Sequence, residues 1–199
     1  MSRPAKPVHN VDVVVVTGMS GSGKSTAINA LEDAGYYCID NLPTELVPRV
    51  VELCAAGTAV ETEKVALGLD VRDISYVENW PRVRHEIEHE GHSVMMIFVD
   101  ADVRGLPGSI EIHVVDPETA ARDDADARGQ PGASSHHVGG GELVALAAQL
   151  TGARPEAVAV GIGVADLELG EGLSPAVEAV VPKVVDLVVN LADRHLAEA

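Results

Sequence analysis

Residues 11–25 read VDVVVVTGMSGSGKS, an apolar run that passes directly into a glycine-rich segment. The β-branched residues of Val11–Thr17 predict a strand buried on both faces, as in a parallel sheet. Helix-forming residues follow in Lys24–Ala34, and Gly35 is suited to end that helix because glycine adopts a positive φ without strain. We therefore expect a strand, a tight loop and a helix, in this order.

The loop between these two elements, Gly18–Ser25, matches the pattern Gly-x-x-x-x-Gly-Lys-Ser/Thr of a phosphate-binding loop. Glycines let successive backbone N–H groups point at phosphate oxygens, and the following helix adds its positive amino-terminal end. The pattern predicts that Lys24 contacts the β- and γ-phosphates, also as a candidate catalytic group, and that Ser25 ligates Mg²⁺. The expected ligand is ATP or GTP with Mg²⁺, bound by Gly18, Met19, Ser20, Gly21, Ser22, Gly23, Lys24, Ser25 and Thr26. The alternative is a glycine-rich turn that binds nothing.

A carboxylate is expected beside this loop, at the end of a neighbouring strand. The apolar run Val94–Val99 ends in Asp100, which we predict to be a Mg²⁺ ligand, directly or through water, and a candidate catalytic residue. The alternative for Asp100 is a helix cap at the end of the strand. Asp40 ends a shorter predicted strand, and there contact with Mg²⁺-bound water and a capping or turn role are equally well supported.

Strands and helices alternate along the rest of the chain. The predicted strands are 36–40, 65–70, 94–100, 110–115 and 157–163, and the predicted helices are 43–55, 77–90, 142–150 and 174–191, with a loop at 116–141. This alternation is typical of an α/β three-layer sandwich with a mostly parallel sheet. We expect a flexible amino terminus at 1–10, a phosphate-loop half at 11–103, and residues 104–199 completing one α/β domain.

The composition disfavours several classes of protein. The 31 acidic and 14 basic residues give a net charge of −17, so the chain lacks the basic face that nucleic-acid backbones require. No apolar run reaches the roughly 18 residues of a membrane span. Cys38 and Cys54 form neither a disulfide framework nor a metal-binding pattern. We expect a cytoplasmic protein whose partner is a nucleotide rather than a membrane or a nucleic acid.

The first half of the sequence resembles the RapZ (YvcJ-type) family of P-loop nucleotide-binding proteins. The resemblance covers about residues 10–103 and rests on Gly18–Asn29, Leu31-Glu32-Asp33-Ala34-Gly35 and Asp40-Asn41-Leu42-Pro43. It implies ATP and GTP binding with weak hydrolysis, and it links a second stretch, Asp70, Val71, Arg72 and Asp73, with GTP. Some members deliver a small RNA for decay, a role associated with a basic carboxyl-terminal domain that the acidic second half of this sequence does not resemble.

From Phe98 onward the sequence is similar to the second half of nickel–iron hydrogenase maturation proteases. This resemblance covers about residues 97–195 and rests on Phe98–Ala101, Leu106-Pro107-Gly108, Ser134-Ser135-His136, Val160-Gly161-Ile162 and Gly172–Pro175. It implies that Asp100 and His136 are metal ligands that read nickel in a hydrogenase large-subunit precursor, which would then be the partner. The family's third acid falls where the phosphate loop stands, and Gly163 replaces another acidic residue, so the protease site is incomplete.

The chain thus resembles two families joined at one strand: a P-loop NTPase-like half and a hydrogenase-maturation-protease-like half that share Asp100. This is the pattern of a chimera, and a recombinant, a designed chain, a natural fusion and a misassembled gene would all produce it. The sequence favours a nucleotide-binding protein with weak ATP or GTP hydrolysis as its candidate reaction. The alternatives are a metal-reading endopeptidase and an inactive chimera.

The segment His85-Glu86-Ile87-Glu88-His89 matches the His-Glu-x-x-His pattern of zinc proteases. This spacing puts both imidazoles on one face of a helix. The segment is highly charged, however, and no later residue stands out as a further ligand. We interpret it as a solvated helix face.

Overall fold

A computed structural model describes residues 9–18, 21–58, 62–69, 74–102, 105–115, 157–165 and 173–198. Its strands are β1 (Asp12–Gly18), β2 (Tyr37–Ile39), β3 (Lys64–Gly68), β4 (Ser93–Asp102), β5 (Ile110–Val114) and β6 (Ala157–Gly163). Its helices are α1 (Lys24–Asp33), α2 (Val47–Ala55), α3 (Ile74–His89), α6 (Pro175–Glu178) and α7 (Val181–Glu198), and a 3₁₀ turn, η1 (Thr44–Leu46), precedes α2.

The described strands form one six-stranded sheet in the order β2-β3-β1-β4-β6-β5. β1 lies between β3 and β4 and pairs in parallel with both, so Val16 faces Gly68 on one side and Ile97 on the other. β6 continues the parallel pairing beside β4, and β5 closes this edge as an antiparallel strand. The expected mostly parallel sheet is confirmed, and it runs without a break from the first half of the chain into the second.

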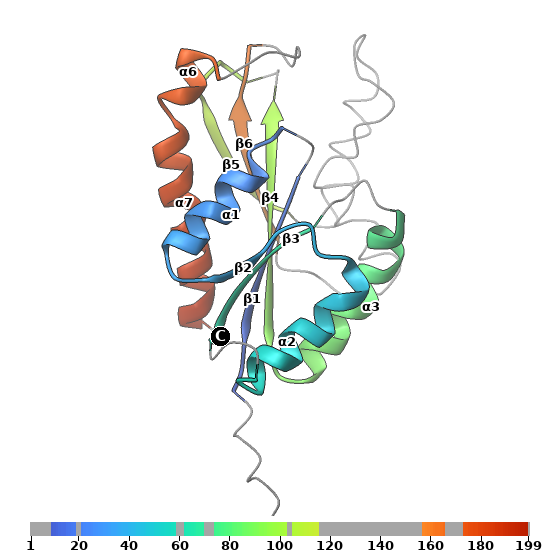
Figure 1. Cartoon of the computed structure of the whole chain (residues 1–199). Helices are drawn as coiled ribbons and strands as arrows, with labels where there is room; N and C mark the ends of the chain where they lie inside the picture. Colours follow the sequence, from blue (N-terminus) through green and yellow to red (C-terminus); the bar gives the residue numbers. More distant parts are fainter. Residues whose placement is uncertain are drawn as a thin grey trace, which may run out of the picture.

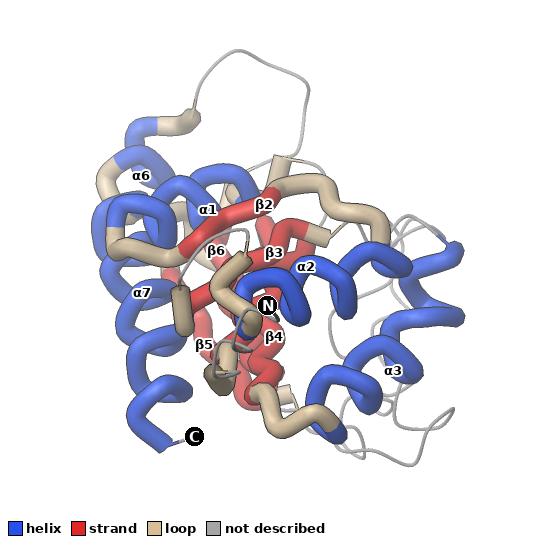
Figure 2. Tube along the Cα trace, turned by 60° about the horizontal axis from the view of Figure 1, so that its bottom comes forward, coloured by secondary structure: helices blue, strands red, loops and turns tan. Residues whose placement is uncertain are grey.

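Helices cover both faces of the sheet and complete the expected three-layer α/β sandwich (Figure 1). α1 and α7 lie on one face, and α2 and α3 on the other, as the view along the sheet in Figure 2 also shows. Alternate residues of β1 supply the two cores: Val13 and Val15 pack toward α2 and α3, and Val14 and Val16 toward α1 and α7. Burial on both faces explains why this strand reads as a continuous β-branched run.

The helix α7, from the second half of the chain, packs against residues of the first half. Its Asp193 accepts a hydrogen bond from the Tyr36 hydroxyl over 3.2 Å and lies 3.1 Å from the Lys64 ammonium nitrogen. Burial, followed by the nearby Asp193 charge, raises the pKa of Tyr36 well above its usual range. Val184 and Val188 of the same helix are buried in the core that also contains Ile28 and Leu31 of α1.

The predicted carboxyl-terminal helix differs from the structure in one respect, because it is divided into α6 and α7. Ser174 caps α6 as expected, accepting a hydrogen bond from the Val177 amide over 3.4 Å. Pro182 stands at the second position of α7 and has no N–H to donate, so a continuous ladder through residues 178–182 is not available. The predicted loop at 116–141, the helix at 142–150 and residues 1–8 of the expected flexible amino terminus lie outside the described residues.

Among the helices that the structure describes, none has the length and apolar character needed to span a membrane.

Candidate phosphate-binding site

The glycine-rich loop lies at the carboxyl end of β1, between β3 and β4 and directly before α1. From this point the strand order runs outward in two directions, toward β2 and toward β5. In open α/β sheets, ligands bind outside the carboxyl ends of the strands where the order reverses. The position of the loop therefore agrees with a ligand-binding role.

Two glycines of the loop are required by its backbone. Gly23 precedes α1 with φ 99°, a left-handed conformation that favours glycine. Gly18 is required by space, because a Cβ atom there would lie 2.2 Å from the Val99 carbonyl oxygen and 2.6 Å from the Ser22 hydroxyl oxygen. Both positions match the fixed glycines of the sequence pattern, which confirms the predicted strand, loop and helix.

The amino-terminal end of α1 has the electrostatic character of an anion site. Its first turn contains Lys24, Ser25 and Thr26 and no acidic residue, so no side chain of the helix itself neutralises the partial positive charge of this end. Lys24 is half-buried, and Ser25 and Thr26 are exposed. Backbone N–H groups and a lysine residue are thus found at the point where the sequence predicts phosphate.

Ser22 has an unusual environment within this loop. Only 5% of its surface is exposed, and its hydroxyl oxygen is buried without a hydrogen-bond partner among the described residues. A buried polar group without a partner costs about 1–3 kcal/mol. Such a group inside a predicted ligand site is therefore a candidate contact for a bound molecule.

Ser25 contacts a carboxylate that follows β2, two strands away at the same edge of the sheet. Its hydroxyl donates a hydrogen bond to Asp40 Oδ2 over 3.4 Å, and Asp40 Oδ1 accepts one from the Asn41 amide over 2.8 Å. Gly68 leaves the room for this carboxylate, since a Cβ atom at Gly68 would lie 2.1 Å from Asp40 Oδ1. Asn41 has φ 55°, so the chain turns sharply just after Asp40.

This arrangement combines the two roles that the sequence left open for Asp40. Its Oδ1 holds the turn, and its Oδ2 faces the hydroxyl of a predicted Mg²⁺ ligand. In the sequence, Asp40 stood out only as part of the Asp40-Asn41-Leu42-Pro43 run. It lies 15 residues after Ser25 in the chain, and nothing in the local pattern indicates that the two side chains meet. The parallel arrangement of β2, β3 and β1 brings them together.

Asp100 lies on the strand where it was expected, since β4 pairs with β1 and Val99 stands opposite Gly18. Asp100 Oδ1 accepts a hydrogen bond from the Ala101 amide over 2.9 Å. Met96 packs toward α2 and α3 whereas Val99 packs toward α1 and α7. Because side chains alternate along a strand, Asp100 projects on the α2 and α3 side, opposite to the face that α1 covers. Its role as a Mg²⁺ ligand stays a prediction.

Several predicted site residues lie outside the described residues: Met19, Ser20, Asp70, Val71, Arg72, Asp73 and His136. Within the described part of the chain, no group of three or more histidine, cysteine, aspartate or glutamate side chains is placed to hold a metal ion. His85 and His89 are both exposed on α3, with ring centres 6.2 Å apart, as a solvated helix face requires.

Comparison with known proteins supports the reading of the first half. Residues 11–107 match the family model described as the RapZ-like N-terminal domain. A nucleotide-binding protein of Myxococcus xanthus is 48% identical over 101 residues, which are 51% of this chain and 32% of that protein. One of Geobacter sulfurreducens is 46% identical over 90 residues, which are 45% of this chain and 31% of that protein. The chain therefore spans about a third of the length of these relatives.

Comparison with solved structures concerns the whole chain. The hydrogenase maturating endopeptidase HybD from E. coli superposes with a TM-score of 0.53, covering 92% of this chain and 93% of that one at 18% sequence identity. A likeness at this identity concerns the fold alone. Both resemblances found in the sequence are thus confirmed: residues 11–107 are similar to the RapZ-like N-terminal domain, and the chain as a whole has the fold of a hydrogenase maturation protease.

Proposed function

We propose that this protein binds a nucleoside triphosphate, ATP or GTP, through the loop Gly18–Thr26. The observation that carries the proposal is the loop geometry, in which Gly18 and Gly23 place the backbone directly before the amino-terminal end of α1, whose first turn has no acidic residue. Lys24 adds a positive side chain at the same point. The match of residues 11–107 to the RapZ-like N-terminal domain and the names of the relatives support the same function.

We infer that Mg²⁺ accompanies the nucleotide and that Ser25 and Asp40 hold it. Mg²⁺ prefers oxygen ligands and keeps several waters, so one hydroxyl and one carboxylate beside phosphate oxygens are sufficient. The contact between Ser25 and Asp40 supports this pair. Asp100 is the alternative carboxylate, from the neighbouring strand β4.

Slow hydrolysis of the bound nucleotide is the reaction proposed for this site. Phosphoryl transfer to water needs a positioned water and neutralisation of the charge that develops on the phosphate oxygens. Lys24 and Mg²⁺ supply part of this neutralisation. We therefore expect the protein to bind nucleotide well and to turn it over slowly.

The test is a titration of fluorescent ATP and GTP in the presence of Mg²⁺. The wild-type protein should bind, and Lys24→Ala should weaken binding by roughly tenfold or more, which corresponds to ~1.4 kcal/mol. Lys183→Ala is the matched control, because Lys183 is an exposed lysine on α7 away from the loop. Equal affinities of the wild type and Lys24→Ala would mean that the loop is only structural.

The endopeptidase alternative is supported by the fold, and one measurement separates it from nucleotide binding. A ligand that binds the native state raises the melting temperature. We expect stabilisation by Mg²⁺-nucleotide and none by Ni²⁺. Stabilisation by Ni²⁺ alone would favour a metal-reading protein, and no response to either would favour an inactive chimera.

A further inference from the structure

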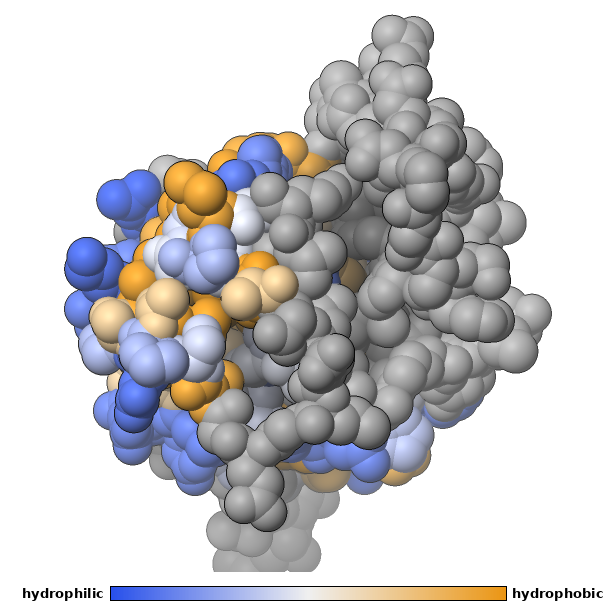
Figure 3. Space-filling view, turned by 90° about the horizontal axis from the view of Figure 1, so that it is seen from above, coloured by the Kyte–Doolittle hydropathy of each residue, from blue (hydrophilic) through white to orange (hydrophobic). Residues whose placement is uncertain are grey.

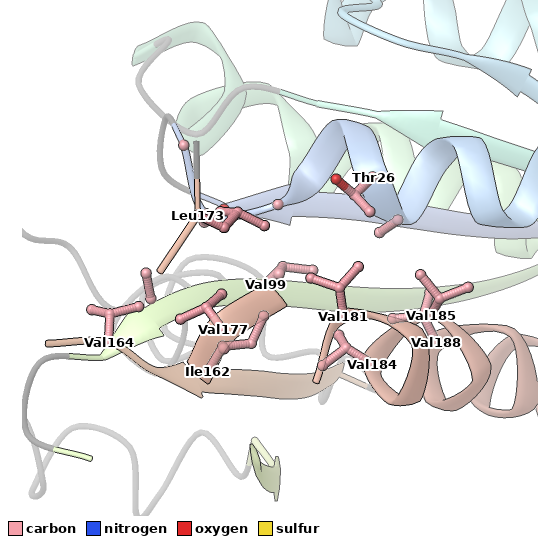
Figure 4. A pocket seen from close by; sticks show the side chains of 15 residues that line it. Thr26, Val99, Ile162, Val164, Leu173, Val177, Val181, Val184, Val185 and Val188 are labelled. Atoms are coloured by element: carbon pink, nitrogen blue, oxygen red, sulfur yellow. The ribbon is translucent and has the colours of Figure 1, made fainter. Parts of the chain in front are cut away.

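A cavity of about 110 Å³ lies beside the phosphate-binding loop, between α1 and α7. Its floor is formed by Val99 of β4 and Ile162 of β6, and its walls by Thr26 of α1 and by valines of α7 (Figure 4). The loop residues Gly21, Ser22 and Gly23 line it as well. The cavity and the predicted phosphate site therefore share the same loop.

The lining of this cavity is almost entirely apolar. Val181, Val184 and Val185 are typical of it, and the described lining residues include no charged side chain. In Figure 4 the side chains of Val181 and Val185 extend from α7 toward α1. Such a lining disfavours phosphate and suits the flat faces of an aromatic group.

One polar group in the lining lacks a partner. The Ser22 hydroxyl is buried and has no hydrogen-bond partner among the described residues, although it lines the cavity. An occupant with hydrogen-bonding atoms on its edge would satisfy this hydroxyl while its faces contact the valines. A purely apolar occupant would leave the cost of the buried hydroxyl in place.

The size of the cavity limits the occupant further. An apolar cavity of about 150 Å³ in another protein accommodates a single benzene ring, so a space of about 110 Å³ that opens to solvent can take only one edge of a larger ring system, and not a whole nucleotide. The open end lies near the carboxyl edge of the sheet, where Leu173 lines the cavity and is 59% exposed. Seen from this end, apolar surface lies among hydrophilic residues in the described part of the molecule (Figure 3).

We propose that this cavity receives one edge of the base of the nucleotide whose phosphates the loop binds. This inference rests on the proposed function, and it assigns to the lining residues of β6, α6 and α7 a binding role outside the matched range 11–107. The phosphates remain outside on the loop N–H groups and Lys24, and one edge of the base enters between α1 and α7, where Ser22 contacts it. The second half thereby contributes part of the ligand site as well as part of the sheet.

The experiment compares ATP with inorganic tripolyphosphate, each with Mg²⁺, by calorimetric titration. The wild-type protein should bind ATP roughly tenfold or more tightly than tripolyphosphate, because only ATP carries a nucleoside, whose base reaches the cavity. Val185→Phe fills the cavity and should bring ATP affinity down toward that of tripolyphosphate, while tripolyphosphate affinity stays within about twofold. Val181→Phe is the second filling variant, used if Val185→Phe does not fold by circular dichroism.

Val189→Phe is the matched control. Val189 is half-buried one turn further along α7 and is not among the described residues that line the cavity, so the same substitution there should change neither affinity. Equal wild-type affinities for ATP and tripolyphosphate would assign the cavity to another occupant or to none, and would overturn the proposal while leaving phosphate binding intact. The proposal would also be overturned if a cavity-filling variant lowered the affinities for ATP and tripolyphosphate equally, or lowered neither. Failure of the wild type to bind either ligand would overturn the proposed function and this assignment together.

Discussion

The Ser25 hydroxyl and the Asp40 carboxylate meet over 3.4 Å, at the point where α1 begins and β2 has ended. This contact joins a residue of the phosphate-loop pattern to an acid that no phosphate-loop pattern includes. The contact depends on Gly68 of β3, because the Asp40 carboxylate occupies the space that a side chain at position 68 would fill. The pair provides the sharpest tests of the proposed magnesium site.

Replacing Asp40 by Asn should lower the Mg²⁺-dependent part of nucleotide affinity by about tenfold, or ~1.4 kcal/mol. The amide still accepts the hydrogen bond from Asn41 but lacks the negative charge that holds a divalent cation. Nucleotide titrations with and without Mg²⁺ measure the effect, and the affinity without Mg²⁺ should not change. Asp100→Asn is measured in parallel, and we expect a smaller loss there because its side chain projects on the opposite side of the sheet. A larger loss for Asp100→Asn would place the metal ligand on β4.

Replacing Gly68 by Ala should displace the Asp40 carboxylate from Ser25. The added Cβ atom would lie 2.1 Å from Asp40 Oδ1, closer than two unbonded atoms can approach. We expect a loss of Mg²⁺-dependent affinity similar to that of Asp40→Asn, and a loss of about 1–3 kcal/mol in the free energy of unfolding. Gly161→Ala is the control, because its nearest contact would be an ordinary 3.8 Å. If Gly68→Ala binds Mg²⁺-nucleotide like the wild type, the Ser25–Asp40 contact has no part in the metal site.

The stability of the protein should decrease between about pH 7 and pH 5.5 because of His92. Its side chain is buried, and its Nδ1 accepts a hydrogen bond from the Val11 amide over 3.1 Å. Burial lowers the pKa of His92 from its usual value near 6.5, and Glu90 and Asp12 oppose this shift more weakly. As the pH falls below 6.5 the unfolded chain takes up a proton that the folded chain does not, so the free energy of unfolding falls.

Urea unfolding at several pH values measures this dependence. His92→Asn should be less stable at pH 7 and should show a shallower slope over the same range. His85→Gln, at an exposed position on α3, should keep the slope of the wild type. Identical slopes for the wild type and His92→Asn would show that another group titrates.

Replacing His85 and His89 together by Gln should alter neither the metal content nor the free energy of unfolding appreciably. Both side chains are exposed, and exposed polar substitutions usually change stability by less than about 0.5 kcal/mol. Elemental analysis of the purified wild type and the double variant provides the measurement. One zinc ion per chain in the wild-type protein, and none in the double variant, would contradict the interpretation as a solvated helix face.

Much of the fold could be predicted from local residue patterns. The β-branched run of β1, the glycines around Lys24 and the proline after Ser174 each impose a backbone conformation that depends on neighbours in the chain. The division between α6 and α7 was missed because the apolar spacing continues through Pro182, and spacing reports the buried face rather than the continuity of hydrogen bonds.

The sequence alone determined the conformation of the glycine-rich loop between β1 and α1, because its glycines act through backbone geometry within eight consecutive residues. The contact of Asp40 with Ser25 and the cavity between α1 and α7 depended on the tertiary structure. They arise from the order β2-β3-β1-β4-β6-β5, which brings residues far apart in the chain to one edge and one face of the sheet. The strand order results from the packing of both helix layers against the sheet. A local sequence pattern does not indicate which distant residues will be neighbours.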